Sequence, residues 1–199
     1  VQIEPCSHEE ADTRLVLHLL DAAHAVHEKI RIRTYDTDVV VVILSKLAII
    51  PMAREVWISF AVGKHCRYIA AHTIAATLGP TKAPALAVLH AFTGSDTTSF
   101  FAGIGKGQHG KLGMFFPDVT DAFSLLADAP PGIIDSTYEV LEKYVVLLYD
   151  KTCQLTPVNE ARQHLIARRS RALENIPPTQ AALKQHKLRT AYQAGHVWG

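Results

Sequence analysis

The chain has 199 residues, 48% hydrophobic and 20% charged, and its 20 Lys and Arg nearly balance 19 Asp and Glu. This composition is too apolar for a disordered chain. Its apolar runs are also too short for a membrane helix, which needs about 20 residues. The near-neutral total hides two unlike parts. Residues 1–150 hold 12 basic and 17 acidic side chains, a net charge of −5, whereas residues 151–199 hold 8 and 2, a net charge of +6.

The cysteines indicate the compartment. Cys6, Cys66 and Cys153 are far apart, odd in number and without a CxxC pair. We therefore expect no disulfide framework and no disulfide-linked partner, as is usual inside the cell. The chain opens at Val1 without a secretory signal pattern. We expect an intracellular protein that is a fragment of a longer one.

The first half alternates helical and extended patterns. In chain order it predicts a helix over His8–Glu28 behind a Ser7/Glu10 capping box, a strand over Ile30–Thr34, a hairpin of Val56–Val62 and Cys66–Ile69, and helices over His72–Leu78 and Pro84–Phe92. The segment Val39–Ser45 is ambiguous. Its β-branched residues favour a strand, whereas the preceding Asp36-Thr37-Asp38 favours a helix start.

The second half has a helical pattern after a glycine-dense stretch at 103–113. The predicted helices are Asp118–Ala127, Ser136–Tyr149, Val158–Glu174 and Thr179–Gln193. Alternation in the first half and helices in the second favour an α/β layer fold with a helical C-terminal part. We place the boundary after residue 150.

Five carboxylates stand where predicted elements begin or end. Glu10 and Asp12 open the first helix, Asp36 and Asp38 follow the first strand, and Asp96 follows a helix. In open α/β sheets, ligands bind at the carboxyl ends of strands. Converging carboxylates suit Mg²⁺, and two ions about 4 Å apart stabilise both oxygens of a displaced phosphodiester. Taken singly, each acid also fits a helix cap or turn, so spacing leaves a structural role open.

The order of these motifs resembles that of the flap-endonuclease branch of the PIN-like nuclease superfamily. That family has a Glu-x-acid pair opening a helix, an Asp-x-Asp after a strand, a Gly-Ser-Asp closing a later helix, and a Gly-Ile-Gly turn in a helix–hairpin–helix. The corresponding segments are Glu10-Ala11-Asp12, Asp36-Thr37-Asp38, Gly94-Ser95-Asp96 and Gly103-Ile104-Gly105-Lys106. The resemblance covers roughly residues 7–115. More exactly, the chain resembles an uncharacterised group of animal proteins with this core, which includes proteins from mobile-element-rich genomes.

The resemblance implies a PIN-like three-layer core with a central, mainly parallel sheet over residues 1–150, followed by a basic helical extension over 151–199. It implies that the five carboxylates are catalytic and bind two metal ions, either Mg²⁺ or Mn²⁺. It implies further that Gly103, Gly105 and Lys106 hold a duplex backbone, a contact that glycine N–H groups make irrespective of base sequence. The family's upstream acids and basic arch precede Val1, and Thr97 stands where an aromatic residue is frequent. We therefore expect part of an active site.

Three other sites lack a required residue. Gly105–Lys111 satisfies G-x-x-x-x-G-K, but Leu112 follows where a P-loop needs Ser or Thr. Asp12 occupies the place of the second histidine of a zinc protease motif. His24 and His27 fit one helix face but lack a third ligand at metal spacing, so we expect solvated or hydrogen-bonded histidines.

The sequence thus predicts a metal-dependent, structure-specific nuclease-like domain, incomplete or inactive as given, with DNA rather than RNA as partner and a nuclear location. The alternative is a non-catalytic nucleic-acid-binding or scaffold protein on the same fold. Under both hypotheses the phosphate-contacting side chains include Arg168, Arg169 and Arg171, with Arg162, Lys184, Lys187 and Arg189 nearby in sequence. Solvated helix faces explain these charges equally well.

Overall fold

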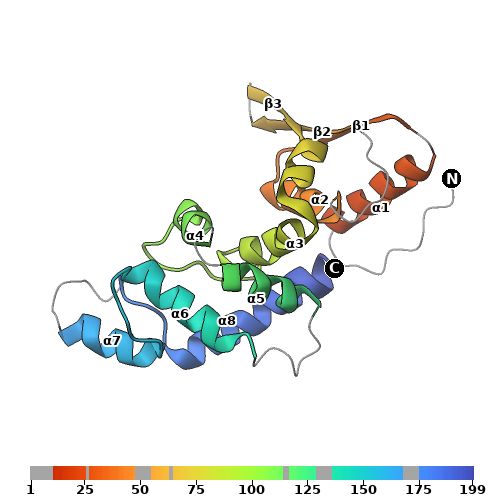
Figure 1. Cartoon of the computed structure of the whole chain (residues 1–199). Coiled ribbons are helices and arrows are strands. Elements are labelled where there is room, and N and C mark those ends of the chain that lie inside the picture. Colours follow the sequence, from red (N-terminus) through yellow and green to blue (C-terminus); the bar gives the residue numbers. More distant parts are fainter. Residues whose placement is uncertain are drawn as a thin grey trace. The chain divides into compact units, whose positions relative to one another are not determined.

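A computed structural model describes residues 11–25, 27–47, 55–62, 65–113, 117–128, 136–167 and 175–199 (Figure 1). The chain forms two compact units. Unit 1 comprises Val1–Ala87 and Val197–Gly199, and unit 2 comprises Val88–His196. In the described part the fold is α/β, with eight α-helices and one three-stranded sheet. The expected α/β class is confirmed.

Unit 1 is built on a mixed sheet with the strand order β1-β2-β3. Strand β1 (Lys29–Thr34) runs parallel to β2 (Glu55–Val62), which pairs antiparallel with β3 (His65–Ala70). The predicted strand and hairpin are therefore confirmed. Instead of a mainly parallel sheet, the described strands form one parallel and one antiparallel pair.

Helices α1 (Ala11–His24) and α2 (Thr37–Leu47) pack against each other and against one face of the sheet. The core between them includes Leu19, Ile32, Val39, Ile43, Leu44, Val56 and Ile58. Helix α1 ends at His24, four residues before the predicted end at Glu28. The predicted start of this helix and its Ser7/Glu10 capping box lie outside the described residues.

The ambiguous segment Val39–Ser45 is helical and forms most of α2. Helix propensity differs by at most about 0.7 kcal/mol per ordinary residue. Burial of one Val or Ile side chain contributes about 1.5–3 kcal/mol, and Val39, Val42 and Ile43 are all buried on one helix face. In addition, parallel strands such as β1 and β2 need a crossover, which is usually helical. Packing and topology therefore outweigh the β propensity.

Helix α3 (Ala71–Phe92) is broken at Gly79, as predicted. Gly79 has φ 75° and ψ 177°, a conformation outside the helical region that glycine adopts without a Cβ clash. Pro80 follows directly, and proline is favoured where a helix resumes because its missing N–H is not needed there. The two predicted helices on either side correspond to the two parts of α3.

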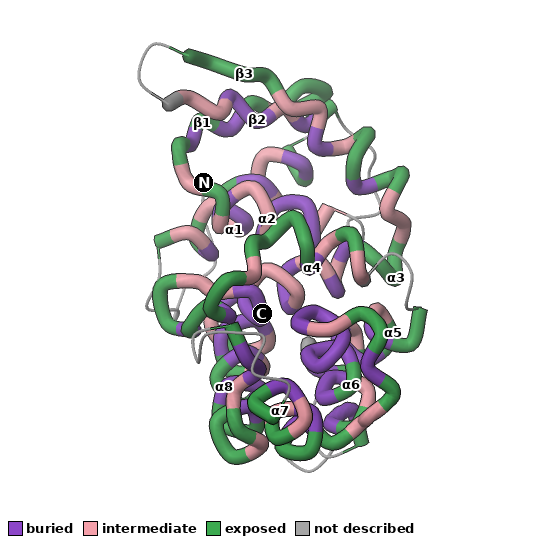
Figure 2. Tube along the Cα trace, turned by 90° about the vertical axis from the view of Figure 1, so that its left-hand side faces the viewer, coloured by how far each residue is buried: buried purple, intermediate pink, exposed green. Residues whose placement is uncertain are grey.

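In its described part, unit 2 is a set of helices packed around α6 (Tyr138–Tyr149), which is almost wholly buried (Figure 2). Its neighbours are α4 (Lys106–Gly113), α5 (Pro117–Asp128), α7 (Val158–Ala167) and α8 (Gln180–Tyr192), and a π-helical turn, Gln193–Val197, follows α8. The predicted boundary after residue 150 falls inside this unit, because α7 and α8 both contact α6. Residues 168–174 of the predicted helix Val158–Glu174 lie outside the described part.

Two further observations concern membrane-spanning helices and the cysteines. No helix of the described segments combines the length and apolarity needed to cross a bilayer. Cys66 is exposed and Cys153 is buried, and both are free thiols.

Candidate functional site

The carboxyl end of β1 leads directly into the first acidic pair. The Asp36 N–H donates to Thr34 Oγ1 at 3.0 Å, and Asp36 Oδ1 accepts from the Asp38 N–H at 2.8 Å. Asp36 is therefore the N-cap of α2, a position where Asp satisfies a helix N–H that lacks an intrahelical acceptor. Asp36 is half-buried, and its second carboxylate oxygen makes no hydrogen bond with the described residues. One oxygen has a structural role, and the other is open to a ligand.

Asp38 and Asp12 occupy equivalent positions on neighbouring helices. Asp38 lies in the first turn of α2, Asp12 lies in the first turn of α1, and both are half-buried. Negative charge is stabilised at a helix N-terminus by the helix dipole, which partly accounts for both carboxylates without a metal.

Glu10 and Asp96 are the remaining two predicted ligands. Glu10 lies outside the described residues. Asp96 is exposed, belongs to unit 2 and makes no hydrogen bond or ion pair with the described part of the chain. The described segments hold no group of three or more His, Cys, Asp or Glu side chains that could ligate a metal ion. The five-ligand site remains a prediction, of which Asp36 and Asp38 form the geometrically defined part.

The Gly94–Thr98 segment forms a tight turn after α3. Ser95 and Thr98 exchange backbone hydrogen bonds of 3.2 and 3.3 Å, and the Ser95 N–H also lies 2.9 Å from Thr98 Oγ1. Gly94 has φ 113°, and a Cβ added there would lie 3.0 Å from Cβ of Phe100. The Gly-Ser-Asp motif is thus explained locally as a turn that presents Asp96 to solvent.

The glycine turn before α4 uses part of its backbone internally. The Gly105 N–H donates to Gln108 Oε1 at 3.0 Å, and the Gln108 N–H donates to the Gly105 carbonyl at 2.9 Å. The Gln108 side chain thus makes one half of a capping box, while Gly105 at the N-cap has no side chain to make the other. Gly103 has φ 73°, and an added Cβ would clash with Asn175 Oδ1 at 2.5 Å. The next N–H groups at this helix start, those of Lys106 and Gly107, are among those that a helix leaves without an intrahelical acceptor.

Two histidines that the sequence did not single out lie in the core of unit 2. His109 on α4 is fully buried, and its Nδ1 lies 3.2 Å from the Tyr144 hydroxyl, which donates to the His109 carbonyl. His186 on α8 packs edge-on against Phe92 and Phe101, with Nε2 2.8 Å from the Phe92 carbonyl oxygen. Burial lowers the pKa of His109 to about 4, with a smaller contribution from His186. Sequence spacing could not reveal this cluster, because it includes residues from four helices, α3, α4, α6 and α8.

The basic C-terminal side chains divide by environment. The Lys184 and Lys187 ammonium groups lie 5.2 and 4.7 Å from the ring centroid of Tyr138, and Lys187 is buried. The Arg162 guanidinium, half-buried, donates to the Pro177 carbonyl. Arg189 is exposed. At least three of these cations thus stabilise the helical packing, while Arg168, Arg169 and Arg171 lie outside the described residues.

Comparison with known proteins adds no family assignment. No protein-family model, no curated protein and no solved structure matches the chain.

Proposed function

We propose that the chain is a metal-dependent nuclease-like domain that acts on nucleic-acid phosphodiesters and is built on a PIN-like core. The observation that carries this proposal is the position of the half-buried Asp36 and Asp38 at the carboxyl end of β1, in a parallel β1–β2 pair joined through α2. This is the edge of an α/β sheet at which ligands bind.

The donor set fits a hard divalent cation. Carboxylate oxygens are the ligands that Mg²⁺ and Mn²⁺ prefer, and the second oxygen of Asp36 is available. In the proposed site Asp36 and Asp38 hold the cation. A bound ion of this kind would stabilise negative charge on the phosphodiester oxygens.

The start of α4 is the proposed contact for the nucleic-acid backbone. Lys106 is exposed at the first helical position, and its Nζ lies 3.2 Å from Nε2 of His90. The N–H groups of the first helical turn and this ammonium group together suit a phosphate. Such contacts carry no base information, which fits a nuclease that recognises backbone shape, and DNA is the proposed substrate.

The test uses two readouts on the 199-residue chain: Mn²⁺ binding followed by electron paramagnetic resonance, and Mg²⁺-dependent cleavage of a branched DNA. Asp36→Asn keeps the helix cap but removes the charge, so any loss it causes is attributable to the site rather than to folding. Asp38→Asn serves as the second site variant. We expect each to weaken Mn²⁺ binding and to reduce cleavage about a hundredfold or more, as loss of a catalytic electrostatic contact does.

The matched control is Asp121→Asn, which removes an exposed aspartate of α5. It should change neither readout. A chain that binds no Mn²⁺, or whose two site variants behave like Asp121→Asn, would contradict the metal site.

The second candidate is a non-catalytic nucleic-acid-binding protein on the same fold. It is favoured by the capping bond of Asp36, which gives that carboxylate a role in the fold without any metal. Under this alternative, affinity for DNA survives Asp38→Asn and falls steeply with salt, because phosphate neutralisation releases counterions. Measuring both DNA affinity and cleavage for Asp38→Asn therefore separates the two candidates, because only the nuclease loses an activity with this change.

A further inference from the structure

The sheet of unit 1 has two chemically different faces. Ile30, Ile32, Val56, Ile58 and Phe60 belong to the apolar cluster under α1 and α2. Since side chains alternate along a strand, the residues between them point to the other side, which we call the outer face. Its rows across the strands are Lys29–Glu55, Arg31–Trp57–Ala70 and Arg33–Ser59–Tyr68. Strand β3 is exposed along most of its length (Figure 2).

The outer face carries an excess of positive charge. Lys29, Arg31 and Arg33 are exposed, and Lys29 Nζ lies 3.4 Å from the Glu55 carboxylate. Neither arginine forms an ion pair with the described part of the chain. Consecutive cations stand two residues apart on β1, about 6.6 Å along the strand. Cations also protect an edge strand from pairing with another sheet, but that role does not require aromatic neighbours.

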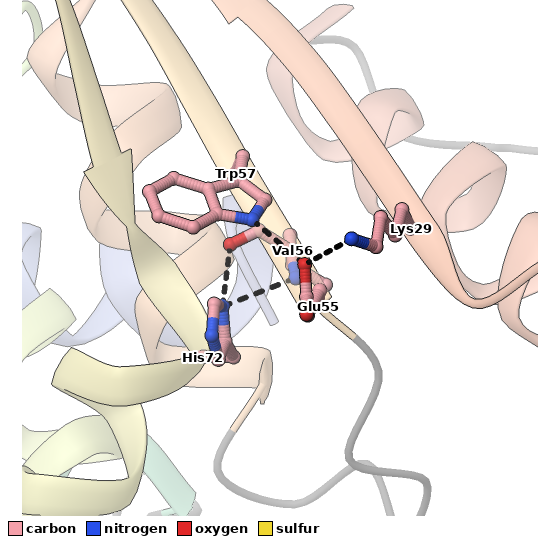
Figure 3. A network of polar contacts seen from close by, with 5 residues as sticks. All are labelled: Lys29, Glu55, Val56, Trp57 and His72. Atoms are coloured by element: carbon pink, nitrogen blue, oxygen red, sulfur yellow. Dashed lines mark hydrogen bonds and ion pairs between the residues drawn. The ribbon is translucent and has the colours of Figure 1, made fainter.

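The outer face also presents an aromatic ring that is held in place. The Trp57 indole N–H donates to Glu55 Oε2 at 3.3 Å (Figure 3). The His72 ring meets the indole at a centroid distance of 5.6 Å and an interplanar angle of 68°, and His72 Nδ1 is itself 3.0 Å from the Val56 carbonyl oxygen. The indole bond and Lys29 lower the pKa of Glu55, which keeps this anchor charged.

A second ring stands one row further along. Tyr68 is 62% exposed and pairs across the strands with Ser59, so it is the diagonal neighbour of Trp57. Diagonal side chains on adjacent antiparallel strands are about 7–8 Å apart, within reach of one ligand. Each aromatic residue thus shares a row with one arginine of β1.

We propose that the outer face binds single-stranded nucleic acid, with Arg31 and Arg33 on phosphates and the Trp57 and Tyr68 rings stacking on unpaired bases. Backbone cations beside aromatic platforms are the combination that single-strand binding requires. A duplex offers phosphates but keeps its base faces stacked internally, and an acidic peptide offers charge without flat rings. The proposal shares the ligand class with the proposed nuclease function but uses none of its carboxylates.

The experiment measures, by fluorescence anisotropy, the binding of a fluorescein-labelled oligo(dT) to the 199-residue chain in the presence of EDTA. The oligonucleotide has about 12 nucleotides, within the usual site size of such domains. Removing both guanidinium groups with Arg31→Gln and Arg33→Gln should weaken binding at least tenfold. It should also lower the slope of log affinity against log salt by about 1.4, since each single-strand phosphate contact contributes about 0.7. Tyr68→Ala should weaken binding about tenfold with an unchanged salt slope, because stacking involves no counterion release.

The control removes two other exposed arginines of unit 1, with Arg14→Gln on α1 and Arg67→Gln on β3, whose side chain belongs to the opposite face from Tyr68. It should leave affinity within about twofold of the unmodified chain, since no phosphate contact is lost. Cys66, exposed beside Ser59 Oγ at 3.2 Å, gives a second readout, because a bound oligonucleotide should slow its alkylation.

Three results would overturn the proposal. The control pair could weaken binding as much as the Arg31 and Arg33 substitutions do, or polyglutamate could displace the oligonucleotide as efficiently as unlabelled oligonucleotide does. In the third, duplex DNA would bind as tightly as the single strand and Tyr68→Ala would not change the affinity. Asp38→Asn should leave this affinity unchanged in EDTA. Failure of the metal site and failure of the outer face therefore give different results.

Discussion

The backbone N–H of Asp38 donates a 2.8 Å hydrogen bond to Oδ1 of Asp36, so two residues of one predicted metal motif are also the cap of a helix. This bond begins α2 immediately after β1 and directs the chain into the crossover that parallel pairing with β2 requires. The capping role of Asp36 and the role of its charge can therefore be told apart only by a variant that keeps one and removes the other.

Substitutions at Asp36 should distinguish capping from charge in unfolding experiments. Asp36→Ala removes the cap and is expected to lower the free energy of unfolding by about 1 kcal/mol, whereas Asp36→Asn keeps the acceptor and should change it by a few tenths. Urea denaturation followed by circular dichroism measures both. Equal losses for the two variants would show that charge, rather than the capping bond, stabilises α2.

Acidification should destabilise the chain through His109. The pKa of this buried imidazole is lowered to about 4, chiefly by desolvation, against about 6.5 in the unfolded chain. Below pH 6.5 the unfolded chain therefore takes up a proton that the folded chain does not, and stability is lost as pH falls from about 6.5 to about 4. The loss can reach about 3 kcal/mol, because one pKa unit corresponds to about 1.4 kcal/mol.

His109→Phe should flatten this pH dependence, since it removes the titrating group and keeps a ring in the core. Urea midpoints at pH 7 and about pH 4.5 provide the comparison, within the window of the shift. His18→Gln, at an exposed position of α1, is the control and should retain the full dependence. The pKa of His186 is also lowered by burial, so a residual slope of the same sign is expected in His109→Phe.

Alanine at two glycines should have opposite effects. Gly94 has φ 113°, and an added Cβ would lie 3.0 Å from Cβ and 3.1 Å from Cα of Phe100, so Gly94→Ala should destabilise by about 1–3 kcal/mol. Gly110 lies inside α4 with no atom within 4 Å of an added Cβ. Gly110→Ala should stabilise by about 0.5–1 kcal/mol through helix propensity. Thermal unfolding of the two variants side by side checks both signs.

Glu142 should prove a structural carboxylate. It is buried on α6, and its Oε1 accepts from the Val158 N–H at 3.0 Å and from Gln180 Nε2 at 3.3 Å, at the starts of α7 and α8. Glu142→Ala leaves these donors without their acceptor and is expected to cost about 2–3 kcal/mol, whereas Glu142→Gln keeps an oxygen there and should cost less. Denaturant unfolding measures the difference. Two variants as stable as the parent chain would contradict a role in joining these helices.

Local patterns in the sequence were sufficient for several elements. The strand ending at Thr34, the hairpin and the break at Gly79 follow from alternation and from turn residues, which act over a few positions. Helix α2 could not be assigned this way, because Val39–Ser45 satisfies both patterns. Its burial against the sheet and the parallel pairing of β1 with β2 decide in favour of the helix.

For the candidate functional residues too, some positions could be predicted from the sequence and others depended on tertiary packing. Motif order places Asp36 and Asp38 at the end of a strand, and the structure confirms that position. The use of Lys184 and Lys187 against the Tyr138 ring, and the burial of His109, depend on helices far apart in sequence. No local pattern carries that information.

The charge asymmetry between residues 1–150 and 151–199 was determined by the sequence alone. Where those charges act was decided by tertiary packing. Lys187 became part of the core of unit 2, while Arg31 and Arg33 stayed exposed on the outer face. The physical reason is that composition fixes how many charges a chain carries, whereas the environment of each charge depends on which elements pack around it.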